Sequence, residues 1–119
     1  MRLVWTGERG YMTTKESEIE AYVKKEIESR GGLFFKFTSP GQTGVPDRII
    51  VMPGGRVFFV EFKTERGRIS KVQAYQLDRI IDLGVEASVI QGMDGAREWI
   101  RDLDAYVIMA GIWRGGDAE

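Results

Sequence analysis

Three charged residues stand at the ends of two strongly apolar runs near the middle of the chain. Asp47 opens the run DRIIVM, Glu61 and Lys63 close the run RVFFVEFK, and a Pro-Gly-Gly turn at residues 53–55 joins the two runs. Carboxylate oxygens are the ligands that Mg²⁺ and Ca²⁺ prefer in proteins. These residues could therefore hold a divalent cation, with Lys63 neutralising part of the remaining negative charge.

The length of the turn decides which of these side chains face one another. Side chains alternate along a strand, so Glu61 and Lys63 share one face. If residues 53–55 form a three-residue loop, Asp47 lies directly opposite Glu61, with Cβ atoms about 5 Å apart. A two-residue loop instead places Asp47 opposite Phe62 and leaves Glu61 and Lys63 as diagonal neighbours, about 7–8 Å away. Either register gathers the three charged groups at one end of the hairpin.

Two interpretations of this cluster stay open from the residues alone. Like charges directly opposite each other destabilise a sheet, and apolar surroundings add a cost of desolvation, which a bound cation would offset. Alternatively, Asp47, Glu61 and Lys63 are solvated charges at strand ends, with Lys63 bridging the two acids. The apolar flanking runs favour the cation site without deciding the matter.

Two further polar residues could join the cluster. Glu20 lies at the flank of the apolar stripe of a predicted first helix, from which it can reach inward. Glu16 lies on the same flank, but a capping box with Thr13 already explains it. Gln73 lies one turn before a core position of a predicted second helix, although a capping box with Ser70 explains that residue as well.

The composition excludes several kinds of chemistry. The chain has 119 residues, 43% hydrophobic and 29% charged, which is typical of one globular domain. It contains no cysteine and no histidine, so thiolate or imidazole metal ligands and Ser-His triads are excluded. No apolar run reaches the ~18 residues of a membrane span, and the N-terminus lacks a signal peptide, so we expect a cytoplasmic protein.

Charge is distributed unevenly along the chain, although the net charge is only −1. Residues 36–79 carry eight basic and four acidic residues, whereas residues 80–119 carry three basic and eight acidic ones. Solvated surface charges could account for this asymmetry. Because the basic segment contains the hairpin, a basic surface beside the candidate site is also plausible.

Hydrophobic periodicity and turn residues predict an alternation of helices and strands. Helices are expected at residues 13–30, 70–83 and 94–103, and strands at residues 33–37, 47–52, 56–63 and 86–91. A helix between the third and fourth strands predicts a parallel crossover added to an antiparallel hairpin. The expected fold class is therefore α/β, a mixed β-sheet flanked by helices.

We divide the chain into three parts. Residues 1–12 form an N-terminal extension without clear periodicity, residues 13–103 form the folded domain, and residues 104–119 form a C-terminal tail. The tail contains the apolar run AYVIMAGIW, which fits a strand, a helix or a contact with a partner subunit.

At this point the sequence resembles a known family. Val45-Pro46-Asp47 and Glu61-Phe62-Lys63 are similar to the signature of PD-(D/E)XK nucleases. The surrounding residues resemble more closely the stand-alone VRR-NUC domains of phages and bacteria, over residues 13–103. The matching motifs, in chain order, are Glu16–Glu20, Gly31-Gly32, Lys36, Ser39-Pro40-Gly41, Gly44–Asp47, Glu61–Lys63, Gln73 and Leu83-Gly84.

The resemblance implies a fold, a cofactor and roles for individual residues. It implies a restriction-endonuclease-like core of order αβββαβ plus a C-terminal helix, and a Mg²⁺ cofactor that Mn²⁺ could replace. Lys63 would orient or help deprotonate the attacking water, and Gln73 would support the site. The implied metal ligands are Asp47, Glu61, the Phe62 carbonyl and Glu20.

The resemblance also implies a substrate and an assembly. It implies a homodimer that cuts branched DNA, such as four-way Holliday junctions, in a bacterium or a phage-infected cell. The alternatives are a restriction-like nuclease or nickase acting on linear DNA, and a non-catalytic DNA-binding module. The expected DNA contacts come from basic and polar residues of the middle segment, namely Lys36, Ser39, Arg48, Arg66, Arg68 and Lys71.

Overall fold

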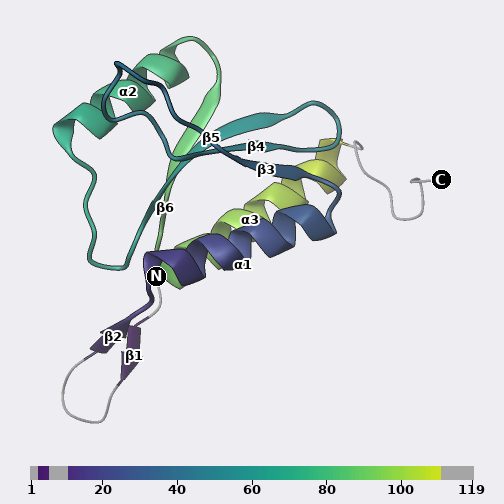
Figure 1. The fold of residues 1–119 in the computed structure, drawn as a ribbon. Helices are drawn as coiled ribbons and strands as arrows, with labels where there is room; N and C mark the ends of the chain where they lie inside the picture. The colour runs from purple at the N-terminus through teal and green to yellow at the C-terminus, as the bar shows by residue number, and fades with distance from the viewer. Residues whose placement is uncertain (1–2, 6–10, 111–119) are drawn as a thin grey trace.

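The computed structural model describes residues 3–5 and 11–110 (Figure 1). Two short N-terminal strands are followed by a core of three helices and four strands. The elements are, in chain order, β1 Leu3–Trp5, β2 Tyr11–Thr13, α1 Glu16–Ser29, β3 Leu33–Lys36, β4 Arg48–Val51, β5 Val57–Lys63, α2 Lys71–Asp82, β6 Glu86–Gln91 and α3 Gly92–Ala110.

The core sheet has the strand order β3-β4-β5-β6. β3, β4 and β5 are antiparallel neighbours, whereas β6 returns through α2 to pair with β5 in parallel. The expected α/β class, with a parallel crossover added to an antiparallel hairpin, is therefore confirmed. The strands β1 and β2 form a separate two-stranded sheet that projects from the N-terminal end of α1 (Figure 1).

Two layers of helix enclose the sheet (Figure 1). α1 and α3 lie side by side on one face, and α2 lies beyond the other face, where it contacts β6. Residues at alternate positions of β4 and β5 point into the layer between the sheet and the helices α1 and α3. The buried apolar residues of this core are Ile19, Val23, Ile27, Ile50, Met52, Phe58, Val60, Phe62, Ile90, Ala96, Ile100 and Leu103. None of the helices among the described residues is long and apolar enough to cross a membrane.

The start of α1 differs from the sequence-based prediction. The helix begins at Glu16, after Lys15, rather than being capped by Thr13. The Lys15 backbone N–H donates to Glu18 Oε1 at 3.3 Å, so Glu18 occupies the position in the first turn that had been predicted for Glu16. The predicted Thr13–Glu16 capping box is therefore wrong, and the Glu16 carboxylate is available for another role.

The hairpin register is the one predicted for a three-residue loop. The pairs run from Val51 opposite Val57 to Arg48 opposite Val60. The Met52 N–H donates to the Arg56 carbonyl at 2.8 Å, which closes the loop at residues 53–55. One further step along this register places residue 47 opposite residue 61, as a cluster of the two carboxylates requires.

The start of α2 agrees with the prediction from sequence, whereas the end of α3 does not. Ser70 Oγ accepts from the Gln73 N–H at 3.1 Å, and the Ser70 N–H donates to Gln73 Oε1 at 2.8 Å, so the capping box of α2 is confirmed. α3 is longer than predicted, since it continues to Ala110. The Arg30 guanidinium holds both carboxylate oxygens of Asp104 at 2.7 Å, which ties the extension to α1. The rest of the tail, residues 111–119, lies outside the described residues.

Candidate active site

The position of Asp47 is set by a close contact between the loop before it and helix α2. Gly44 has φ +81°, and a Cβ added there would lie 2.3 Å from Val72 Cγ1 and 2.9 Å from the Val72 carbonyl carbon. The Gln76 side-chain amide, which is buried, donates to the Thr43 carbonyl at 3.0 Å. The loop is therefore fixed against α2 immediately before the chain reaches Asp47 and enters β4.

Glu61 is a buried carboxylate in the middle of the site. Its side chain is 2% exposed, Oε2 accepts from the Gln73 amide at 3.1 Å, and Oε1 is buried with no donor among the described residues. Burial, and then the adjacent Asp47 carboxyl, raise the pKa of Glu61 to about 8, although the Lys63 ammonium acts in the opposite direction. Without a cation, the Glu61 side chain would therefore be mostly protonated at neutral pH.

This arrangement fits a divalent cation. A buried carboxylate oxygen without a donor is costly, and a second carboxylate beside it adds repulsion. A cation held between the two groups would satisfy that oxygen and remove the repulsion. The donor set consists of oxygen atoms only, which is the set that Mg²⁺ and Mn²⁺ prefer.

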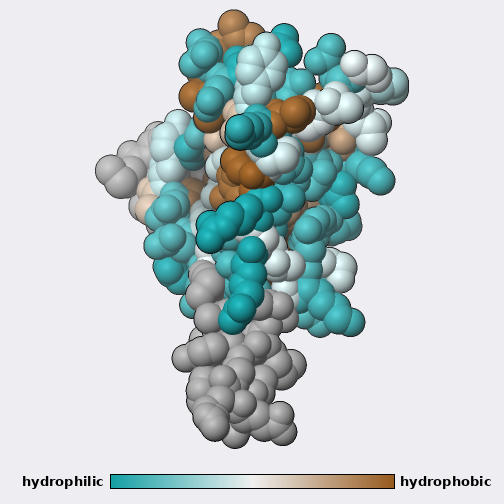
Figure 2. Space-filling model, turned by 90° about the vertical axis from the view of Figure 1, so that its left-hand side faces the viewer, coloured by the Kyte–Doolittle hydropathy of each residue, from teal (hydrophilic) through white to brown (hydrophobic). Residues whose placement is uncertain are grey.

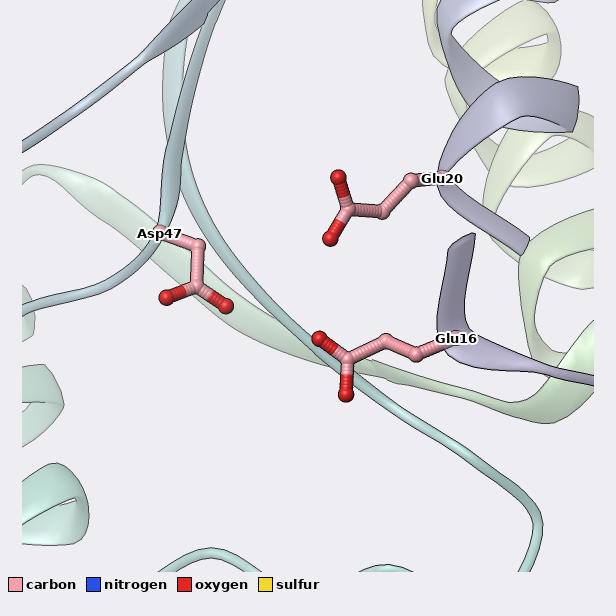
Figure 3. A group of neighbouring side chains, drawn as sticks. All are labelled: Glu16, Glu20 and Asp47. Carbon is pink, nitrogen blue, oxygen red and sulfur yellow. The ribbon is translucent and has the colours of Figure 1, made fainter. Parts of the chain in front are cut away.

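Two glutamates of α1 approach Asp47 from the other side (Figure 3). One carboxylate oxygen from each of Glu16, Glu20 and Asp47 lies within 4.8 Å of the other two, and all three side chains are partly buried. Glu20 Oε1 also accepts from Arg48 Nη2 at 2.6 Å, whereas the structure gives Glu16 no hydrogen bond within the described residues. Burial and the neighbouring carboxylates Asp47 and Glu20 raise the pKa of Glu16.

Phe62 and Lys63 directly follow Glu61 at the end of β5. The positive charge of Lys63 acts to lower the pKa of both Glu61 and Glu16. Lys63 makes no ion pair within 4.0 Å among the described residues. The Phe62 side chain is fully buried in the core on the opposite face of β5, which leaves only its backbone carbonyl as a possible ligand.

The predicted DNA-contacting residues divide into two groups. Arg48 is turned inward, bonded to Glu20 and stacked 5.8 Å from the centre of the Phe34 ring, so a phosphate contact from it would compete with that ion pair. The others lie at the surface, Ser39 half-buried and the charged ones exposed: Lys36, Ser39, Arg66, Arg68 and Lys71. On the α2 side, hydrophilic side chains surround a smaller apolar area (Figure 2).

Two acidic residues near the candidate site were not predicted from the sequence. Glu16 was assigned to a helix cap, although its spacing of four residues from Glu20 already placed both on one flank of the helix. Glu65 is 6% exposed and accepts from the backbone N–H groups of Thr14 at 2.8 Å and Met93 at 3.3 Å. Burial acts to raise the pKa of Glu65, but hydrogen bonding from the Thr14 side chain, and then from the backbone of Glu65, Met93 and Thr14, outweighs burial, so the pKa is lowered. Nothing in the local sequence indicates contacts over such separations.

Comparison with known proteins agrees with this fold. Residues 8–94 match the VRR-NUC domain family. A phage protein called "Putative nuclease p44", from Acyrthosiphon pisum secondary endosymbiont phage 1, is 35% identical over 80 residues, which are 67% of this chain and 86% of that protein. A solved "VRR_NUC domain" structure has a TM-score of 0.70 at 29% identity and covers 74% of this chain and 96% of its own.

A second solved structure, a "VRR_NUC domain protein", has a TM-score of 0.61 at 16% identity, over 82% of this chain and 91% of that one, and is similar in fold. Fold and matches together define a nuclease domain. The chain belongs to the VRR-NUC domain family. The resemblance found in the sequence is therefore confirmed.

Proposed function

We propose that this nuclease is a Mg²⁺-dependent endonuclease that hydrolyses phosphodiester bonds in branched DNA. The observation that carries the proposal is the buried Glu61 carboxylate, with one oxygen lacking a donor, next to Asp47. An all-oxygen site of this kind supports binding of a hard divalent cation. The family supports the choice of a nucleic-acid substrate.

In this proposal the cation is held by Asp47, Glu61 and the Phe62 carbonyl, with Glu20 on its α1 side. The position of Glu16, within 4.8 Å of the Glu20 and Asp47 carboxylates, supports adding it to this set. The bound cation would lower the pKa of a water molecule and stabilise negative charge on the phosphate. Mn²⁺ should replace Mg²⁺, since it accepts the same oxygen ligands.

Two residues would support the reaction without holding the cation. Lys63, which follows Glu61 by two residues on β5, would orient the attacking water and steady the charge that develops on the phosphate. Gln73 donates to Glu61 Oε2, which keeps this carboxylate in one orientation and leaves Oε1 for the cation.

The proposed homodimer matches the two-fold symmetry of the proposed substrate. A four-way junction requires two matched cuts, which a homodimer with two sites would provide. Exposed basic residues at positions 66, 68 and 71 lie on the segment that follows Lys63, so they would contact phosphates near the cut without reading sequence.

A cleavage assay tests the proposal. The protein is incubated with a four-way junction, a flap and a linear duplex in Mg²⁺, Ca²⁺ or chelator. We expect cleavage of the junction in Mg²⁺, and losses of at least about a hundredfold for Asp47→Ala, Glu61→Ala and Lys63→Ala. Asp78→Ala, which removes an exposed carboxylate from α2, is the matched control and should retain full activity.

Binding measurements separate the remaining alternatives. Asp47→Ala should bind the junction at least as tightly as the wild type, because it removes a negative charge. Equal cleavage of linear duplex would favour a restriction-like nuclease or nickase. Absence of metal-dependent cleavage on all three substrates, with DNA binding retained, would establish a non-catalytic DNA-binding module instead.

A further inference from the structure

Glu65 connects three segments that are distant in the sequence. One carboxylate oxygen accepts from the backbone N–H of Thr14, two residues before α1 begins. The other accepts from the N–H of Met93, in the first turn of α3. Glu65 itself follows the last residue of β5 by two positions. A single buried side chain thus joins the end of β5 to the starts of two helices.

The turn that carries Glu65 is fixed from a second direction. The Gln91 side-chain amide, at the end of β6, donates to the carbonyls of Gly67 at 2.6 Å and of Thr64 and Glu65 at 3.3 Å. A Cβ added at Gly67 would lie only 3.3 Å from Lys63 Cβ, so this part of the turn runs close to Lys63. The turn therefore has little freedom to move relative to Lys63.

We propose that Glu65 is a positioning residue, which sets the distance between the α1 carboxylates and the end of β5 by holding Thr14 and Met93. Glu16 lies two residues after Thr14, and Lys63 lies two residues before Glu65. The inference rests on the proposed function, because the geometry that Glu65 maintains is that of the candidate cation site. It assigns Glu65 no contact with cation or DNA.

The number and direction of the bonds favour this role over general stabilisation. A buried carboxylate that only filled space would be costly, and an apolar residue would serve better. The two Glu65 oxygens accept from the backbone N–H of Met93, in the first turn of α3, where a carboxylate is well placed, and from the N–H of Thr14, which immediately precedes the N-cap of α1. Residues that orient ligands through such contacts commonly alter metal affinity or activity about 10–100-fold when replaced.

The test compares two polar contacts that hold α1 against the rest of the fold. Glu65→Gln replaces one carboxylate oxygen, which accepts a hydrogen bond from a backbone N–H, by an amide NH₂ group, which cannot accept it. Arg30→Gln, the control, removes the ion pair with Asp104 at the opposite end of α1. Mg²⁺ affinity is measured by calorimetry, backbone protection of residues 14–18 by hydrogen exchange, and junction cleavage as separate kcat and KM. Each is measured well below the melting temperature of the variant.

For Glu65→Gln we expect about tenfold weaker Mg²⁺ binding, about tenfold lower kcat with KM little changed, and lost protection at residues 14–18. Arg30→Gln should lower the melting temperature with less than a twofold change in Mg²⁺ affinity. If Glu65→Gln does not fold, Gln91→Ala, which frees the same turn from an exposed position, should show the same pattern with smaller amplitude.

Two outcomes would overturn the inference in distinguishable ways. If either Glu65→Gln or Gln91→Ala loses stability but keeps wild-type Mg²⁺ affinity and kcat, then Glu65 is a structural residue only. A wild type that binds no Mg²⁺ would remove the proposed function, and the positioning role with it.

Discussion

The folded environment of Glu61 opposes the negative charge of its carboxylate, because the side chain is buried next to Asp47. Its pKa of about 8 lies above the ordinary value of 4.5. A carboxyl with a raised pKa contributes stability that is fully present below pH 4.5 and is lost as the pH rises through 8. Above pH 8 the folded protein buries a negatively charged Glu61 carboxylate beside Asp47, which lowers the free energy of unfolding.

This gives a prediction for the metal-free protein. In chelator, wild type and Glu61→Gln should have similar stability near pH 5, and Glu61→Gln should become the more stable of the two above pH 8, by up to a few kcal/mol. Thermal unfolding across this range measures the difference. Saturating Mg²⁺ should stabilise the wild type and leave Glu61→Gln nearly unchanged. A constant difference between the two proteins from pH 5 to pH 9 would contradict the prediction.

At the residue scale, spacing and alternation predicted which faces of the helices and strands carry Glu20, Glu61 and Gln73. The structure brings Glu20 within 4.8 Å of Asp47, and Gln73 donates to Glu61 as well as capping α2 with Ser70. Glu16 was missed because Thr13 offered a local alternative, and only the observed start of α1 decides between the two. Glu65 could not be found, since its partners are 51 and 28 residues away.

At the scale of elements, the loop before β4 and helix α2 behave as one unit. Gly44 allows the loop to touch Val72, and Gln76 adds a buried hydrogen bond to the same loop. Because α2 also carries Gln73, movement of the loop relative to α2 would separate Asp47 from the residues that hold Glu61.

Gly44→Ala and Gly41→Ala form a matched pair that tests this contact. Both glycines have a positive φ, +81° and +84°, so both variants should lose about 1 kcal/mol from backbone strain. Only Gly44→Ala adds a collision with Val72, whereas a Cβ at Gly41 would meet nothing within 4 Å. We expect Gly44→Ala to lose about 1–3 kcal/mol more in denaturant unfolding and to cleave at least tenfold more slowly. Equal losses would mean that the loop is not held by α2.

The sequence predicted most of the elements because their patterns are local. Hairpin register followed from the turn at residues 53–55, and the parallel crossover followed from the helix between two strands. The end of α3 was not predicted, because the apolar run after Leu103 lacks a period that separates strand from helix. Its continuation is supported by Arg30 and Asp104, 74 residues apart, a contact that no local pattern contains.

At the scale of the whole molecule, charge is separated between the basic middle of the chain and its acidic C-terminal part. The exposed arginines of the turn after β5, Arg66 and Arg68, make no ion pair within the described residues, and the turn that carries them is bonded to Gln91. Free cations on a fixed turn lose little conformational entropy when they bind phosphate.

The double variant Arg66→Gln/Arg68→Gln should weaken junction binding and reduce the slope of log affinity against log salt by about two. Binding titrations at several salt concentrations measure this slope. Mg²⁺ affinity should be unchanged, because neither residue lies in the carboxylate cluster. Arg97→Gln/Arg101→Gln on α3 is the control and should leave the slope as in the wild type. If the two double variants behave alike, the DNA lies elsewhere.

The pairing of β4 with β5 around the tip at residues 53–55 limits how related chains can differ. Side chains of a strand face alternate sides, so a slip of β4 against β5 by one residue would turn Asp47 away from Glu61, whereas residues added within the tip only lengthen the loop. Homologous chains should therefore tolerate changes of residue type and of length at this tip, as long as the pairing of β4 with β5 is kept. Comparison of this pairing among active relatives can be made without any experiment on this protein.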